Sequence, residues 1–295
     1  MLVGLSAVVA LLAGCAHSSP TSGAGAASGQ SLQVKGSDTM VNLGQAWAEA
    51  FGAKTGIQVM ITGGGSGTGI AALLSGTCDV AESSRKMADK ELADAQAKGL
   101  TPKEYMVAMD GLAVVVNPEN PVSRLTIDQL AAVFTGRITN WRDLGGADAE
   151  IVLLSREVNS GTHVYFKEHV LRKGKQKGQE EFSDAALLSP SSQSIADEVS
   201  YNDQAIGYFG MGYRSDKLKL IAVAQTAAGP YVDPTPENVV NGTYPISRPL
   251  LFYTNGEPAG VVKQYLDFVL GPEGQKLVAE QDFVPVPQPA AAKGG

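Results

Sequence analysis

The first hundred residues beyond the N-terminal segment repeat one order of elements, which is strand, loop and helix. Apolar runs at residues 32–35, 57–62 and 78–81 have the composition of short strands, and each leads into glycine, serine or other polar residues. A helical pattern follows each one, most clearly at residues 40–51, where apolar residues recur every three or four positions. This order predicts a parallel sheet with helices on its faces.

The same unit recurs in the second half of the chain, at residues 151–171. The apolar strand that starts at residue 105 is long enough to leave one lobe and enter another, and residues 248–256 look like a strand that returns. A pair of helices at residues 261–286 follows. We therefore predict an α/β protein of two lobes, each a mixed, mostly parallel sheet flanked by helices, joined by a hinge of two crossovers. The predicted boundaries are residues 31–110 with 247–290 for the first lobe and 111–246 for the second.

One helix boundary can be predicted from its own side chains. Thr126 precedes apolar residues with helical spacing, so its hydroxyl can accept hydrogen bonds from the free N–H groups of a first turn. Gly136 lies shortly after Phe134 and suits the left-handed conformation in which many helices end. We therefore predict a helix over residues 127–134.

Residues 2–14 form an apolar run that is too short to span a bilayer and that ends in small residues before Cys15. Residues 12–15 resemble a bacterial lipobox, so we expect residues 1–14 to be a lipoprotein signal peptide and Cys15 to carry the lipid. Residues 15–30, rich in serine, glycine and alanine, are then a flexible tether. No Lys or Arg precedes the run, so either the natural start lies upstream or the signal is weak. The alternative is a buried apolar strand or helix.

The net charge of -7 argues against nucleic acid or an anionic membrane surface as the main partner. It also requires any anion site to rely on local donors. With Cys15 lipidated, Cys78 is the only other cysteine, so we expect no disulfide within the chain. His163 and His169 lack the i, i+4 spacing of helical zinc motifs, so we expect no metal and no cofactor.

Three loops that follow strands carry hydroxyl side chains beside glycine, at residues 36–39, 63–69 and 156–162. Each should open a helix, whose start leaves about four backbone N–H groups unpaired and carries roughly half a positive charge. Glycine lets a ligand approach such amides closely. Loops of this kind, aimed from two lobes into one cleft, form a cage for an oxyanion. Arg156 adds the only permanent charge, and its planar guanidinium can donate hydrogen bonds to two oxygens at once.

Each loop taken alone also has a purely structural explanation. Ser37 and Thr39 could be helix caps, and the glycine run could be a turn packed closely on a strand. Arg156 could form a surface ion pair with Glu157. The glycine run lacks the spacing of dinucleotide-binding, P-loop and nucleophile-elbow motifs, and the sequence shows no metal-ligand cluster and no nucleophile–base pair. We therefore expect no catalytic residues, and the co-occurrence of three loops favours an anion-binding site.

Five segments resemble the periplasmic phosphate-binding protein of high-affinity phosphate ABC transporters: GSDTM, GGGSGTGIAALLSGTCDVAESSR, LTIDQLAAVFTGRITNW, SREVNSGTH and AIGYFGMGY. The match begins near the first strand, and the segments follow in the order of that family. The resemblance implies a type II periplasmic-binding-protein fold whose lobes close by hinge bending on one phosphate. By position, it implies these phosphate-binding residues: Ser37, Asp38, Thr39, Ser66, Gly67, Ser84, Arg85, Arg156, Ser160, Gly161 and Thr162.

Two positions depart from the family pattern. Ser84 stands where the best-known members have an aspartate that accepts the proton of phosphate. Such a carboxylate discriminates against sulfate, because sulfate has no proton to donate. Asp38 could supply that acceptor, or hydroxyls and a backbone carbonyl could. Arg85 could be a second ligand cation or part of a lobe-to-lobe ion pair. Val158 stands where an acid often steadies the arginine, and Glu157 could take that role.

The resemblance also implies a function. A monomeric protein, lipid-anchored on the periplasmic or extracellular face of the cytoplasmic membrane, would capture inorganic phosphate and deliver it to the membrane permease of an ABC transporter. The other hypotheses are a binding protein for another tetrahedral oxyanion such as sulfate or molybdate, a secreted phosphatase-like enzyme, and an adhesion or signalling module.

Overall fold

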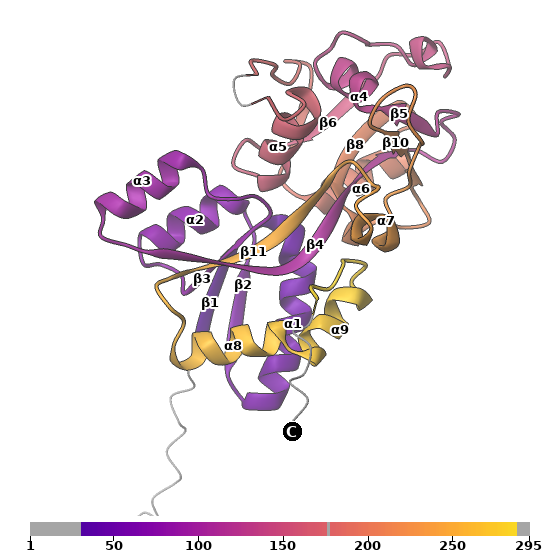
Figure 1. Cartoon of the computed structure of the whole chain (residues 1–295). Helices are drawn as coiled ribbons and strands as arrows, with labels where there is room; N and C mark the ends of the chain where they lie inside the picture. Colours follow the sequence, from indigo (N-terminus) through magenta and orange to yellow (C-terminus); the bar gives the residue numbers. More distant parts are fainter. Residues whose placement is uncertain (1–30, 176–177, 288–295) are drawn as a thin grey trace, which may run out of the picture.

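The computed structural model of the chain describes residues 31–175 and 178–287, and Figure 1 shows their arrangement. Two lobes can be seen, and two long strands pass from one into the other. The predicted signal peptide, the predicted lipidation site at Cys15 and the predicted tether lie outside the described residues. Within these ranges, no helix has the length and apolar character needed to cross a membrane.

The first lobe is built on three parallel strands. β1 (Ser31–Gly36) lies between β2 (Gln58–Thr62) and β3 (Val80–Ser83). The predicted order of strand, loop and helix is confirmed here, with one difference: the second helix begins inside the glycine-rich loop. The helices of these units are η1 (Asp38–Met40) with α1 (Val41–Thr55), α2 (Ser66–Leu74) and α3 (Asp89–Ala97).

Two long antiparallel strands, β4 (Pro102–Val116) and β11 (Ser247–Asn255), connect the lobes. β11 also pairs with β3 in the first lobe. β4 continues into the second lobe, where it pairs with β8 (Ala205–Gly210) and β9 (Lys219–Leu220). The predicted returning strand is therefore confirmed, whereas the exact boundaries of the lobes stay a prediction.

The second lobe continues the same sheet. β6 (Val152–Arg156) is parallel to β8 and to β7 (Leu187–Ser189), so the strand order is β2-β1-β3-β11-β4-β8-β6-β7. A separate parallel pair joins β5 (Arg124–Thr126) to β10 (Ala222–Ala224). The helices of this lobe are α4 (Ile127–Phe134), η2 (Trp141–Leu144), α5 (Gly161–Phe166) continued by the π-helical η3 (Lys167–Leu171), α6 (Ser192–Tyr201), η4 (Met211–Tyr213) and α7 (Pro236–Val240).

Helix α4 has the boundaries that its sequence predicts. Thr126 Oγ1 accepts a hydrogen bond from Gln129 N at 3.1 Å, and Gln129 Oε1 accepts one from Thr126 N at 2.9 Å. Gly136, with φ of 73°, lies just beyond the end of the helix. Phe134 packs edge-on against Phe166 with ring centroids 4.9 Å apart, so this helix belongs to the core of the second lobe.

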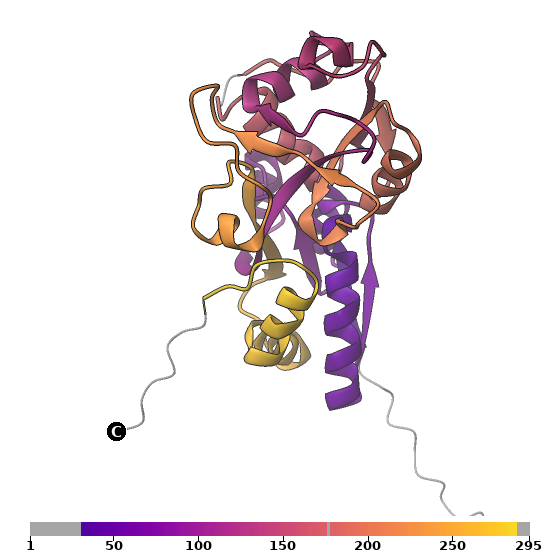
Figure 2. The ribbon, with the colours of Figure 1, turned by 90° about the vertical axis from the view of Figure 1, so that its right-hand side faces the viewer.

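The first lobe is completed by α8 (Gly260–Leu270) and α9 (Pro272–Glu280), which lie beside α1 (Figure 2). Trp47 of α1 is buried and donates from Nε1 to Gly274 O at 2.8 Å. Its ring packs edge-on against Phe252 of β11, with centroids 5.6 Å apart. Burial of an aromatic side chain contributes about 2–3 kcal/mol, so these contacts fix α1 against both the sheet and the helix pair. The predicted helix pair is confirmed.

Two glycines let α2 lie directly against the end of β1. Gly36 has φ of 146°, and a Cβ there would lie 2.0 Å from Glu82 O. A Cβ on Gly69 of α2 would lie 2.4 Å from Lys35 O. Because neither position has room for a side chain, the loop after β1, the start of α2 and the loop after β3 lie together at one edge of the sheet.

Candidate functional site

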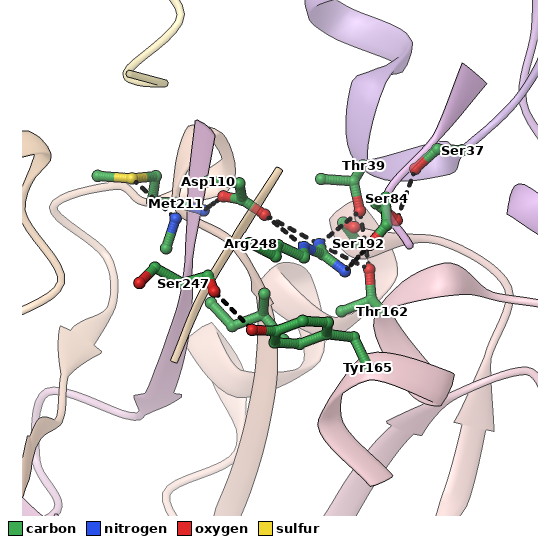
Figure 3. A network of polar contacts seen from close by, with 12 residues as sticks. Ser37, Thr39, Ser84, Asp110, Thr162, Tyr165, Ser192, Met211, Ser247 and Arg248 are labelled. Atoms are coloured by element: carbon green, nitrogen blue, oxygen red, sulfur yellow. Dashed lines mark hydrogen bonds and ion pairs between the residues drawn. The ribbon is translucent and has the colours of Figure 1, made fainter. Parts of the chain in front are cut away.

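Five hydroxyl groups, which we call the hydroxyl cluster, meet where the two lobes face each other. Thr39 Oγ1 in the first lobe lies 2.8 Å from Thr162 Oγ1 in the second (Figure 3). Ser37 donates to Ser84 Oγ at 3.0 Å, and Ser66 Oγ lies 3.3 Å from Ser84 Oγ. All five side chains are buried. Since a hydroxyl can rotate and can both donate and accept, the cluster can adapt to the oxygens of a small anion.

The start of α5 packs against this cluster from the second lobe. A Cβ on Gly161 would lie 2.3 Å from Ser66 Oγ, so only glycine fits here while the lobes are in contact. Ser160 is the N-cap of α5, and its Oγ accepts hydrogen bonds from Thr162 N at 3.2 Å and from His163 N at 3.4 Å. The structure therefore brings the predicted residues of this loop to the hydroxyl cluster.

The cation of the cluster is Arg248, the second residue of β11. Its Nη2 donates to Thr162 Oγ1 at 3.0 Å and to Thr39 Oγ1 at 3.3 Å, and its Nη1 donates to Ser84 O at 3.1 Å (Figure 3). On the other side, Nε and Nη2 donate to Asp110 Oδ2 at 3.0 and 2.9 Å. The side chains of Arg248 and Asp110 are both 0% exposed. One guanidinium thus contacts hydroxyls of both lobes and is held in place by a carboxylate.

Arg248 and Asp110 are absent from the predicted site residues, and the expectation that Arg156 supplies the only permanent charge is wrong. A signal exists in the sequence, because each of the two connecting strands carries a charged residue beside an apolar run. A charged side chain in a buried strand requires a partner. The strand register supplies it, since Arg248 lies directly opposite Asp110.

Burial alters the pKa values of this ion pair. It raises the pKa of the Asp110 carboxyl, against the opposing effects of Arg248 and of Met211 N, which donates to Oδ1 at 3.0 Å. It also lowers the pKa of Arg248, and Asp110 opposes that change. The ordinary pKa of arginine is so high that the guanidinium stays charged, with Asp110 as its counter-ion. Removing one partner of such a pair typically costs about 3–5 kcal/mol of stability.

Arg156, at the end of β6, is held mainly by its own lobe. It donates to Ser189 O at 3.2 Å, to Ser192 Oγ at 3.0 Å and to Pro190 O at 2.9 Å. Its Nη2 also lies 3.2 Å from Asp38 Oδ2 of the first lobe, and the same oxygen accepts a hydrogen bond from Ser192 N at 2.7 Å. The buried Arg156 and the partly buried Asp38 therefore form an ion pair between the lobes.

The structure shows the ion-pair partners of Arg156 and Arg85, which the sequence leaves open. Arg156 is 1% exposed and its acidic partner is Asp38, so a surface ion pair with Glu157 is wrong. Arg85 Nη1 and Nη2 each lie 2.7 Å from a carboxylate oxygen of Glu91 in α3 of the same lobe. Within the described residues, Arg85 thus forms its ion pair inside its own lobe and not between the lobes, and no hydrogen bond joins it to the hydroxyl cluster.

A second buried carboxyl group lies behind the first-lobe loops. Glu82 of β3 is completely buried, and neither of its side-chain oxygens has a hydrogen-bond partner among the residues that the structure describes. Burial raises its pKa to about 8. Its backbone oxygen accepts a hydrogen bond from Ser37 N at 2.9 Å, which links this strand to the loop that carries Thr39.

Known proteins match nearly the whole chain. A family model described as a PBP superfamily domain matches residues 19–273. The phosphate-binding protein PstS of Pseudomonas aeruginosa is 35% identical over 280 residues, which cover 89% of this chain and 85% of that protein. The phosphate-binding protein PstS of Bacillus subtilis is 32% identical over 293 residues, which cover 97% of this chain and 92% of that protein. The chain belongs to the PstS family of the PBP superfamily.

A solved structure agrees with this membership of the PstS family. A Clostridium perfringens protein, assigned as a phosphate ABC transporter substrate-binding protein and crystallised with bound phosphate, is 35% identical to this chain, with a TM-score of 0.78. The comparison covers 88% of this chain and 100% of that one. The predicted two-lobed periplasmic-binding-protein fold is confirmed. Members of the PstS family are extracytoplasmic binding proteins of transporters and not enzymes.

Proposed function

We propose that this chain captures inorganic phosphate outside the cytoplasm and delivers it to the membrane permease of an ABC transporter. The observation that carries the proposal is the contact of Arg248 with hydroxyls of both lobes. Guanidinium and hydroxyl groups are suited to oxyanions because they donate several directed hydrogen bonds at once. The names of the PstS relatives and the phosphate-bound Clostridium perfringens protein support phosphate as the anion.

Closure of the lobes couples binding to burial of the ligand. Hydroxyls from two lobes reach one small anion only when the lobes meet, so a bound anion favours the closed arrangement. Exclusion of water then strengthens each hydrogen bond to the anion. We place the hinge where the two connecting strands leave the first lobe, near residues 110–111 and 246–247, with the lobes bounded as the sequence predicts.

The charge of Arg248 is already balanced by Asp110, so this pair adds no net positive charge to the site. Phosphate must therefore be held largely by directed hydrogen bonds from hydroxyl and backbone N–H groups, with Arg248 supplying two or more of them. This fits a chain whose net charge of -7 repels anions at long range.

Ser84 provides one way to recognise the proton that phosphate carries near neutral pH. A hydroxyl oxygen can accept a hydrogen bond from the protonated oxygen of phosphate. Sulfate carries no proton and needs a hydrogen-bond donor at the same position. Because the hydroxyl can switch roles, it discriminates less sharply than a carboxylate. Asp38, whose Oδ2 is held by Arg156 and Ser192, is the second candidate acceptor. Because Ser84 stands where a carboxylate would exclude sulfate, it favours one alternative function, the binding of sulfate or molybdate.

The cellular placement is a separate part of the proposal. A lipid on Cys15 anchors the protein to the outer side of the cytoplasmic membrane, and residues 15–30 tether the two lobes to it as a monomer. The small and polar composition of that segment supports this role. Mass spectrometry of the protein from a membrane fraction would detect the lipid on Cys15, and an unmodified cysteine would contradict the anchor.

Titration calorimetry with phosphate, sulfate and molybdate at pH 7 tests the function itself. We expect one phosphate per chain, and at least about tenfold weaker binding of the other two anions, a difference of about 1.4 kcal/mol. Preferential binding of sulfate or molybdate would support the alternative function. An absence of binding for all three anions would contradict both.

A further inference from the structure

Asn159 joins the two lobes beside the hydroxyl cluster. It lies in the second lobe, between β6 and α5. Its Nδ2 donates to Gly64 O at 2.8 Å and to Thr68 Oγ1 at 3.2 Å, and its backbone oxygen accepts a hydrogen bond from Gly67 N at 3.0 Å. All three partners lie at the start of α2 in the first lobe. One residue therefore makes three hydrogen bonds between the lobes.

The N-cap residue of helix α2 is Gly65, which has no side chain. Among the residues that the structure describes, no side chain forms a capping hydrogen bond there. The first turn of a helix leaves backbone N–H groups without partners inside the helix. Asn159 O is the acceptor for one of them, the N–H of Gly67. The second lobe thus supplies an acceptor for one N–H group at the N-terminus of a helix in the first lobe.

The glycines at this helix start leave room for Asn159. A Cβ on Gly65, whose φ is 95°, would lie 2.9 Å from Asn159 O, and a Cβ on Gly67 would lie 3.3 Å from the same oxygen. A Cβ at Gly65 would clash with the backbone of Asn159, whereas one at Gly67 would make a tight contact with it. The glycine-rich sequence therefore permits close contact between the lobes as well as close approach of a ligand.

We infer that Asn159 is a positioning residue for lobe closure, whose side-chain amide binds the start of α2 when the lobes meet and thereby slows the release of the bound anion. The inference rests on the proposed function, because it requires an anion that leaves only when the lobes part. Once they part, Gly67 N–H and the Asn159 amide can bond to water instead. The contact therefore stabilises the closed arrangement alone, and its loss affects release more than capture, which starts from the open arrangement.

Asn159→Ala removes the two side-chain hydrogen bonds and tests the inference. Loss of two neutral hydrogen bonds should speed the release of phosphate by about tenfold and leave the association rate within about twofold. Asn159→Asp places a carboxylate against Gly64 O and should release phosphate faster still. Val158→Ala is the matched control, because this neighbouring side chain is 70% exposed, and it should release phosphate at the wild-type rate. Release is measured by rapid filtration of protein loaded with radiolabelled phosphate into excess unlabelled phosphate.

Thermal unfolding without phosphate separates positioning from a purely structural role. We expect the ligand-free variants to unfold at the wild-type temperature, because the open arrangement lacks the contact. Release at the wild-type rate in both Asn159 variants would overturn the inference while leaving the proposed function intact. Destabilisation of the ligand-free variants with no change in release would also overturn it. A wild-type protein that binds no phosphate would overturn the proposed function and, with it, the role of Asn159.

Discussion

Replacement of Glu82 by glutamine should remove a pH dependence from the stability of the protein. The carboxyl is completely buried, and burial raises its pKa from 4.5 to about 8. Between these two pH values, the folded protein keeps the proton and the unfolded chain loses it. The unfolded state then binds fewer protons, so the free energy of unfolding falls as the pH rises from about 4.5 to about 8.

The size of the effect follows from the two pKa values of Glu82. Each pH unit in this range corresponds to about 1.4 kcal/mol, so about 4 kcal/mol of stability should be lost between pH 5 and pH 8. Glutamine has nearly the same shape and does not ionise. Glu82→Gln should therefore match the wild type near pH 5 and exceed its free energy of unfolding by about 4 kcal/mol at pH 8.

Urea unfolding of the ligand-free protein at pH 5, 6, 7 and 8 provides the measurement. The exposed Glu150 offers a matched control, since Glu150→Gln should follow the wild-type profile at every pH. Parallel profiles for the wild type and Glu82→Gln would refute the reasoning, because they would show that Glu82 ionises in the folded protein without cost.

Four further substitutions, two of them combined in a double variant, probe the contacts between the lobes. Gly161→Ala should weaken phosphate binding at least about tenfold without changing the ligand-free unfolding temperature, because the added Cβ clashes only when the lobes meet. Unchanged affinity in calorimetry would contradict this. Asp38→Asn leaves Arg156 without its acidic partner in the closed arrangement, so phosphate affinity should fall about tenfold or more, and an affinity equal to wild type would show that the ion pair does not support closure. Arg248→Met should lower the free energy of unfolding by about 3–5 kcal/mol in urea, and adding Asp110→Leu should restore most of that stability but not phosphate binding. A double variant that regains binding would remove Arg248 from the site.

The loops of the site could be predicted because their signal is local. Ser37, Thr39 and Ser66 stand where strands end and helices begin, and the residue types there already favour hydrogen bonds to an anion. The boundary of α4 is similar, because Thr126 and Gln129 satisfy each other's backbone N–H groups within one turn. Local chemistry of this kind does not depend on how distant segments pair.

The cation of the site could not be identified in the same way. Arg248 and Asp110 are 138 positions apart, and their contact depends on the register between two strands. A shift of one residue would turn every side chain of the strand to the other face. Arg156 shows the converse. Its loop has the sequence of an anion site, whereas its guanidinium donates to Pro190 before α6 and to Ser192 at the start of α6, and pairs with Asp38.

A crystal structure of the phosphate-bound protein tests most directly whether hydroxyls of both lobes and Arg248 share one oxyanion. We predict phosphate oxygens within about 2.7–3.2 Å of Thr39 Oγ1, Ser84 Oγ, Thr162 Oγ1 and Arg248 Nη2. Phosphate bound by the hydroxyls of one lobe alone, or with no contact to the guanidinium of Arg248, would contradict this assignment.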